Sequence, residues 1–211
     1  FSAGSVFVWK LLLLGVDLGT CALLAKLLVR LGRARWEVLF YAWNPLVLKE
    51  IAGSGHVDAL AACALTAAAL ALVASSSRER GSARRHATIL SFGALFALGL
   101  AGLAKVTPLA AAPAFLARVS WRRWWVLPAT IALGCLPFAA SLGGFLAGLR
   151  AMGTEWRFNA GAWDLAVALG CRPLALTLAL GGPLAIGWAF ARSARGPRQH
   201  HDPENALRPA Y

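Results

Sequence analysis

Long apolar runs separated by short polar or basic connectors dominate this chain. The runs over residues 6–29, 58–74, 88–104 and 126–142 are predominantly apolar. Each is close to the roughly 20 residues that a helix needs to cross a hydrocarbon core of about 30 Å. They lack the alternation of polar and apolar positions that barrel strands carry. Because backbone polar groups in lipid must pair within their own segment, the runs predict an all-α, polytopic transmembrane helix bundle.

Three further apolar stretches are less regular. The stretch 36–51 contains Pro45, which removes a backbone donor and predicts a kinked span. The stretch 107–116 is shorter than a span and predicts a short returning helix, and a last apolar region covers 162–191. Together these runs predict about six or seven membrane segments over residues 1–191.

Composition agrees with a membrane bundle. The chain is 59% hydrophobic and 14% charged, whereas soluble domains carry about 25% charged residues. Its four cysteines lie in separate apolar runs without metal-ligand spacing, so we expect them to be small buried apolar residues. No cofactor is expected, and no residue pattern supports a divalent cation. The chain opens at Phe1 with no signal peptide before it, and we expect a fragment of a longer protein.

The basic residues predict the orientation. A net charge of +12 invites a nucleic-acid interpretation, but the positive charge lies in short clusters between apolar runs, as the positive-inside rule describes, so no nucleic-acid partner is expected. The clusters cover residues 30–35, 78–85, 118–123 and 192–198. Placing all of them in the cytoplasm leaves three extracytoplasmic connections: 49–58, 105–108 and 150–159, the last within a predicted polar loop over 143–161. The polar, proline-rich residues 192–211 then form a disordered cytoplasmic tail.

The first two extracytoplasmic connections carry the residue types that bind a phosphate. Lys49 and Lys105 supply mobile cations for an anion. His56 can hold or pass a proton, and Asp58 would lie in the first turn of the following helix, whose free N–H groups attract a phosphate. Glu50 is a further ionisable residue in the same ten positions as Lys49, His56 and Asp58. Ionisable groups near membrane depth each cost about 2.5–3.5 kcal/mol, so their gathering on one face favours a function.

The chain between these residues predicts a tight turn. Gly53 and Gly55 permit backbone angles that other residues avoid. Either Ser54 or His56 could cap the helix that follows.

Simpler interpretations of the same residues stay open. Glu50 and Asp58 could be interfacial caps, with Lys49 and Lys105 extended towards the lipid headgroups. His56 and Asp58 lie two positions apart, as metal ligands can, but no third ligand is near them in the sequence, so no metal site is expected.

Two other polar groups are ambiguous. Lys10 and Asp17 lie on one face of the first predicted helix, where a structural ion pair with a neighbouring helix is expected. Glu155, Arg157 and Asn159 resemble a sugar- or phosphate-binding strip and equally fit a solvated loop.

The segment 41–60, which reads YAWNPLVLKEIAGSGHVDAL, resembles a motif of bacterial GT-C glycosyltransferases. The most similar are the integral-membrane, mannosyltransferase-like enzymes of glycosyltransferase family 87 and neighbouring families. The turn 105–108 and the segment 155–159 fit the same pattern more weakly, so the resemblance covers about residues 9–165. It implies a GT-C-like fold and inverting transfer of a mannose-like hexose. The donor would be a polyprenyl-phosphate sugar and the acceptor an extracytoplasmic glycan or glycolipid.

The resemblance also implies roles for individual residues. The donor phosphate would be bound by Lys49, Lys105 and His56. Substrate would be bound by Asn44, Glu50, Arg157 and Asn159. His56 and Asp58 would support catalysis. In this family the presumed catalytic carboxylate follows the first helix, in the first extracytoplasmic loop, and no acidic loop motif occurs at this N-terminus, so we expect the catalytic base upstream of Phe1.

Two other classes of function compete with the transferase. Broken helices with polar residues near the breaks are also typical of transporters, so a transporter or flippase of a lipid-linked or anionic solute is the main alternative. A non-catalytic membrane scaffold is the third. The Ala- and Arg-rich composition favours a bacterial source and therefore the plasma membrane, with membrane lipid as a constant partner.

Overall fold

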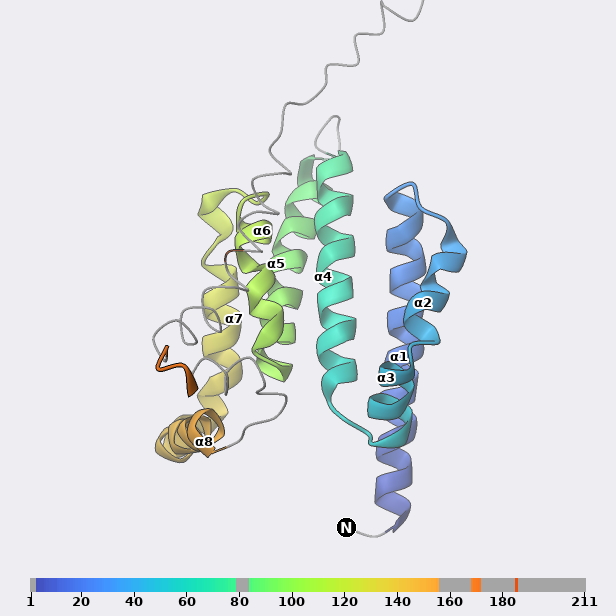
Figure 1. Cartoon of the computed structure of the whole chain (residues 1–211). Helices are drawn as coiled ribbons and strands as arrows, with labels where there is room; N and C mark the ends of the chain where they lie inside the picture. The colour runs from blue at the N-terminus through green and yellow to red at the C-terminus, as the bar shows by residue number, and fades with distance from the viewer. Residues whose placement is uncertain (1–2, 79–83, 156–167, 172–184, 186–211) are drawn as a thin grey trace, which may run out of the picture.

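The computed structural model of the chain describes residues 3–78, 84–155, 168–171 and 185. Over these residues the chain is helical and contains no strand, which confirms the all-α prediction (Figure 1). Four helical runs are long and apolar enough to cross a membrane: Gly4–Arg30, Asp58–Ser76, Arg85–Ala104 and Trp121–Ser141. The expected six or seven segments stay a prediction, because nearly all of the apolar region 162–191 lies outside the described residues.

Three long helices form the centre of the bundle. α4 (Asp58–Arg78) and α5 (Arg84–Ala104) run antiparallel side by side, and α1 (Ala3–Arg30) packs on the other side of α4 (Figure 1). At about 1.5 Å per residue, the 21 residues of α4 match the thickness of a hydrocarbon core. α7 (Val126–Cys135) packs against the far side of α5.

The main core lies between α4, α5 and α7, where Leu95 and Leu98 are fully buried and Phe115 and Leu127 close its edges. Most other large apolar side chains face outward; only 17% of the most apolar part of α1 is buried. Such a surface suits lipid rather than water, and packing between helices in lipid relies on small residues that let backbones approach. Gly99 of α5 is such a residue, because a Cβ there would lie 2.7 Å from the Cβ of Thr130.

The segment after α1 returns along it in short pieces (Figure 1). These pieces are η1 (Arg35–Val38), α2 (Leu39–Ala42), α3 (Pro45–Val47) and the π-helical turn η2 (Leu48–Gly53). The prediction of a single kinked helix over 36–51 is therefore wrong, because the segment consists of four short helical pieces. Pro45 does not bend a continuous helix: it occupies the first turn of a new one, and the side chain of Asn44 accepts a hydrogen bond from the Leu46 amide at 2.9 Å. Proline suits that position because its amide would be unpaired there anyway.

After α5 the chain returns through η3 (Thr107–Ala111) and α6 (Ala112–Leu116), as the predicted short helix. A turn, η4 (Trp121–Arg123), then leads into α7, which is followed by η5 (Leu136–Ser141).

The predicted polar loop over 143–161 is wrong for its first part, because Leu142–Glu155 forms the helix α8. The sequence signal was the apolar spacing of Leu142, Phe145, Leu146 and Leu149, which marks one face of a helix. α8 lies at the lower end of α7 and runs across the direction of that helix (Figure 1). This is the position of a helix that rests in a membrane interface.

The connections sort to the two ends of the bundle as the charge pattern predicts. The turns after α1 and before α7, which carry basic residues, lie at the upper end in Figure 1. The turns between η2 and α4 and between α5 and η3 lie at the lower end. The two ends therefore differ in their chemistry, and the candidate site lies at the lower one.

Candidate functional site

The turn between η2 and α4 is shaped by its own backbone. The amide of His56 donates to the Glu50 carbonyl at 3.0 Å, and the amide of Gly55 donates to the Ile51 carbonyl at 3.1 Å. Gly55 has a φ of +71°, a region that glycine enters without a steric penalty, so the prediction of a glycine-dependent turn is confirmed there. α4 begins at Asp58, which confirms the prediction that this carboxylate lies in the first turn of the helix. Val57 therefore precedes the helix, and the expected cap by Ser54 or His56 is wrong.

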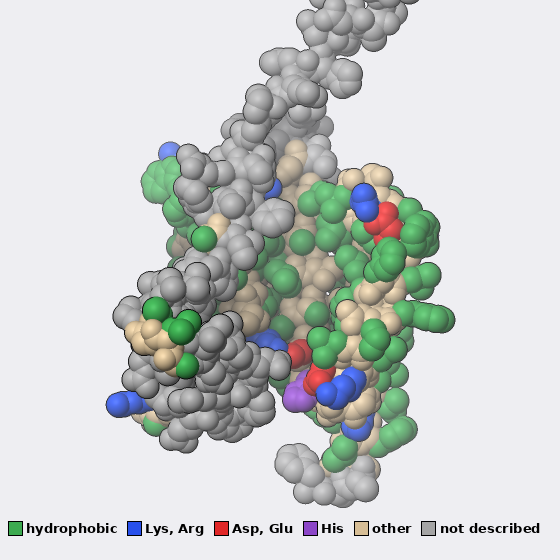
Figure 2. Space-filling model, viewed as in Figure 1, with side chains coloured by type: hydrophobic (Ala, Val, Ile, Leu, Met, Phe, Trp, Pro, Cys, Tyr) green, Lys and Arg blue, Asp and Glu red, His purple; other side chains and the backbone are tan. Residues whose placement is uncertain are grey.

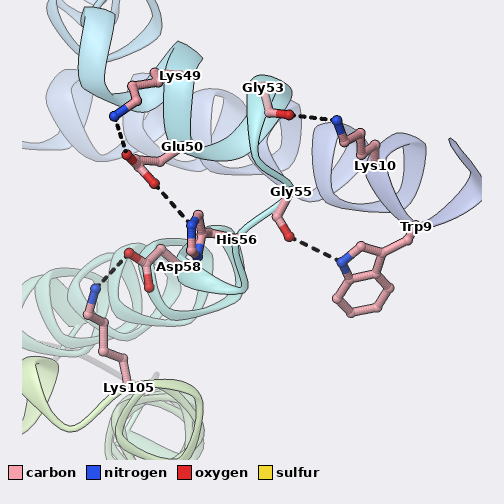
Figure 3. Close-up of polar contacts among 9 residues, drawn as sticks. All are labelled: Trp9, Lys10, Lys49, Glu50, Gly53, Gly55, His56, Asp58 and Lys105. Carbon is pink, nitrogen blue, oxygen red and sulfur yellow. Dashed lines mark hydrogen bonds and ion pairs between the residues drawn. The ribbon is translucent and has the colours of Figure 1, made fainter. Parts of the chain in front are cut away.

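Two side chains of α1 hold this turn in place. The Trp9 indole donates to the Gly55 carbonyl at 3.1 Å, and the Lys10 ammonium donates to the Gly53 carbonyl at 2.6 Å (Figure 3). Sequence reasoning assigned Trp9 no role. It expected an ion pair for Lys10, whereas Lys10 binds a carbonyl. The only sequence signal for this contact was the turn itself, which leaves carbonyl groups without helical partners.

Asp17, the second residue expected in an ion pair, binds an uncharged partner. The Tyr41 hydroxyl donates to its carboxylate at 2.7 Å, and the Asp17 side chain is buried between α1 and α2. The prediction that this face of α1 contacts a neighbouring segment is confirmed, but both bonds are hydrogen bonds rather than ion pairs.

The ionisable residues of the turn form two groups around carboxylates. Glu50 lies 3.4 Å from the Lys49 ammonium and 3.3 Å from Nε2 of His56. Asp58 Oδ2 lies 2.6 Å from the Lys105 ammonium, so the end of α5 meets the start of α4. Figure 3 shows these five side chains converging from the turn and from the end of α5, and Figure 2 shows acidic, basic and histidine side chains together at this end of a mostly hydrophobic surface.

The exposure of these groups differs. The Lys49 side chain is 74% exposed, whereas Glu50, which binds it, is 28% exposed. Lys105 and Asp58 are each close to half exposed. Exposed ion pairs of this kind contribute little to stability. Because both lysine side chains are exposed, they remain accessible to an external anion. A lysine ammonium has three N–H donors, and Asp58 takes one of those of Lys105.

The remaining predicted residues do not join this cluster. The side-chain oxygen of Asn44 caps α3 by accepting a hydrogen bond from the Leu46 amide. Arg157 and Asn159 lie outside the described residues, and so does the side chain of Glu155.

The function of this cluster is indicated neither by a metal-binding arrangement nor by similarity to a known protein. Among residues 3–78 and 84–155 no group of three or more His, Cys, Asp or Glu side chains is placed to hold a metal ion. In comparisons with known proteins, no family model, no curated protein and no solved structure matches this chain.

Proposed function

We propose that this chain belongs to an integral-membrane glycosyltransferase of the GT-C type. It would move a mannose-like hexose from a polyprenyl-phosphate donor to an extracytoplasmic glycan or glycolipid. The observation that carries the proposal is the convergence of Lys49, His56 and Lys105 with two carboxylates at one end of the bundle, opposite its basic connections. A donor with one phosphate and several hydroxyl groups needs this mixture of cations and carboxylates.

The bundle offers the two surfaces that such a donor requires. The polyprenyl chain would lie in lipid against the exposed apolar side chains of α1 and α2, among them Leu12 and Phe40. The phosphate would lie between Lys49 and the free donors of Lys105. Asp58 then positions Lys105, and Glu50 positions His56, while Oδ1 of Asp58 would accept a hydrogen bond from a sugar hydroxyl group. Asn44, at the start of α3, and Arg157 and Asn159 remain proposed substrate contacts.

The chemical step follows from this placement. The oxygen of an acceptor hydroxyl forms a bond to the anomeric carbon from the face opposite the phosphate. The bond between that carbon and the phosphate oxygen breaks, and its electron pair leaves with the phosphate, so the anomeric configuration inverts. Lys105, Lys49 and His56 stabilise the negative charge that develops on the departing phosphate. The acceptor proton passes to a general base, which the family places in the first extracytoplasmic loop, and we assign that role to no residue of this chain.

A transfer assay tests the proposal directly. Protein in membranes is supplied with a labelled polyprenyl-phosphate hexose, and transfer by Lys105→Ala and His56→Ala is compared with the unsubstituted protein. Loss of a preorganised charge-stabilising donor lowers turnover by about 10²–10³-fold, so we expect a large loss in Lys105→Ala.

The matched control is Lys26→Ala. It removes the same charge from the other end of α1. Near-normal transfer by both site variants, or equal losses in site and control variants, would contradict the assignment.

A transporter or flippase is the second candidate, because one observation favours it. The segment from η1 to η2 crosses beside α1 in short pieces separated at Asn44 and ends in a π-helical turn next to ionisable side chains. Broken helices of this kind form substrate sites in transporters. Movement of a lipid-linked or anionic solute across vesicles without any sugar transfer would favour this candidate over the transferase.

A further inference from the structure

A polar cavity lies at the basic end of the bundle, far from the cluster just described. It has a volume of about 670 Å³ and lies between the first turns of α5 and the η4 turn. Six of its lining residues are three arginines and three hydroxyl-bearing residues: Arg118, Arg122, Arg123, Thr88, Ser91 and Ser120. In a bundle whose surface is mainly apolar, a cavity with this lining requires a polar occupant.

Neighbouring side chains hold the arginines without neutralising them. Arg123 donates to the Thr88 hydroxyl at 3.1 Å, and its guanidinium lies 5.7 Å from the centre of the Phe92 ring. Arg118 donates to a backbone carbonyl of α6 at 3.0 Å. The guanidinium of Arg122 lies over the Trp121 ring. Aromatic faces and neutral oxygens orient a guanidinium while its charge is retained.

The described residues that line the cavity include three arginines and no acidic residue. In the part of the chain that the structure describes, no carboxylate forms an ion pair with any of the three arginines. Each guanidinium has five N–H donors, and the hydrogen bonds of Arg118 and Arg123 described above each use one, so most donors remain for an anion. Ala87, in the first turn of α5, also lines the cavity, and the positive end of a helix dipole favours an anion there.

The anion that suits this lining is a phosphate group. Arginine matches phosphate oxygens with paired N–H donors, and hydroxyl groups such as that of Ser120 add further bonds. Trp121, Trp124 and Trp125 surround the η4 turn and are exposed. Tryptophan concentrates at the depth of the lipid headgroups, so the cavity opens where headgroup phosphates lie.

We infer that this cavity is a phosphate-binding site on the basic face of the bundle. The headgroup of an anionic membrane lipid would supply the phosphate, and a free phosphate in solution carries the same chemistry. The inference does not depend on the glycosyltransferase proposal, because the two sites lie at opposite ends of the bundle and share no residue.

The experiment uses the full chain in nanodiscs of neutral phosphatidylcholine. In one arm, phosphatidylglycerol is added in increasing proportion and the retained lipid is counted by native mass spectrometry. In the other arm, inorganic phosphate is titrated and its heat of binding is measured. We expect saturable retention of one phosphatidylglycerol. Competition by inorganic phosphate would show that the site also accepts the free ion.

Variants then locate the binding. Arg123→Gln and the double variant Arg118→Gln/Arg122→Gln should each weaken binding by about tenfold or more, as expected for lost charge-assisted hydrogen bonds. The double variant serves if Arg123→Gln fails to fold, because Arg118 and Arg122 are exposed at the rim. The matched control is Arg35→Gln, which removes one exposed arginine at the start of η1, outside the cavity.

Each outcome decides the inference. Weaker binding in the cavity variants, with the control within about twofold of the unsubstituted protein, supports a defined site. Equal weakening in the control would show that the surface potential alone retains the lipid, and would overturn the inference. Absence of saturable binding in both arms would overturn it as well.

Discussion

The Lys105 ammonium lies 2.6 Å from Oδ2 of Asp58, so the residue that follows α5 is joined to the first residue of α4. These two residues are far apart in the sequence and meet because the helices are antiparallel neighbours. Their contact joins the segments 49–58 and 105–108, which the charge pattern placed on the same side of the membrane. This contact therefore brings residues that were predicted separately into one candidate site.

This ion pair should matter more for function than for stability. Both side chains are close to half exposed, and exposed pairs contribute about 0.2–1 kcal/mol. A double-mutant cycle with Lys105→Met and Asp58→Asn, measured as the free energy of unfolding in detergent, should return a coupling within that range. Sugar transfer by the same variants should fall far more steeply. A coupling of several kcal/mol with unchanged transfer would assign the pair a structural role instead.

The conformation of Gly55 should be required for the turn that carries His56. Gly55→Ala places a side chain at a φ of +71° and 3.3 Å from Cγ of Lys10. A left-handed backbone costs about 1–2 kcal/mol for residues other than glycine, so the free energy of unfolding should decrease by about that amount. Gly53→Ala is the matched control, because its new Cβ would meet its nearest neighbour at an ordinary 3.8 Å. Equal losses of stability in both variants would contradict a specific requirement for glycine at position 55.

The bond between Tyr41 and Asp17 should stabilise the packing of α2 on α1. Tyr41→Phe leaves a buried carboxylate without this donor, which should lower the free energy of unfolding by about 1–3 kcal/mol. Asp17→Asn retains an oxygen acceptor and should cost less. Asp17→Leu combined with Tyr41→Phe should recover part of the loss, because no buried polar group is then left unpaired. A Tyr41→Phe protein as stable as the unsubstituted one would contradict this role.

The proposed orientation can be tested by cysteine labelling. In a background with the four native cysteines replaced, Ser54→Cys and Ser120→Cys each place one exposed thiol at opposite ends of the bundle. A reagent that cannot cross membranes should label the first in intact cells and the second only after permeabilisation, as the positive-inside rule requires. The reverse pattern would place the ionisable cluster in the cytoplasm and exclude the proposed extracytoplasmic transfer.

The sequence by itself determined the features that depend on local pattern. Apolar run length predicts the spans of α1, α4 and α5, because a helix in lipid needs only enough consecutive apolar residues. The distribution of arginines predicts which connections share an end of the bundle. Gly55 and Asp58 were located correctly, since a positive φ and a first-turn carboxylate follow from residue type.

Only the tertiary structure decided which of these residues meet. Lys105 binds Asp58, and Trp9 and Lys10 bind the turn before α4, because helix packing brings distant positions within hydrogen-bond distance. The same holds for Arg123 and Thr88 at the cavity of the basic end. No local pattern encodes such pairs: each depends on the rotation and depth of two helices relative to one another, and these are set by packing across the whole bundle.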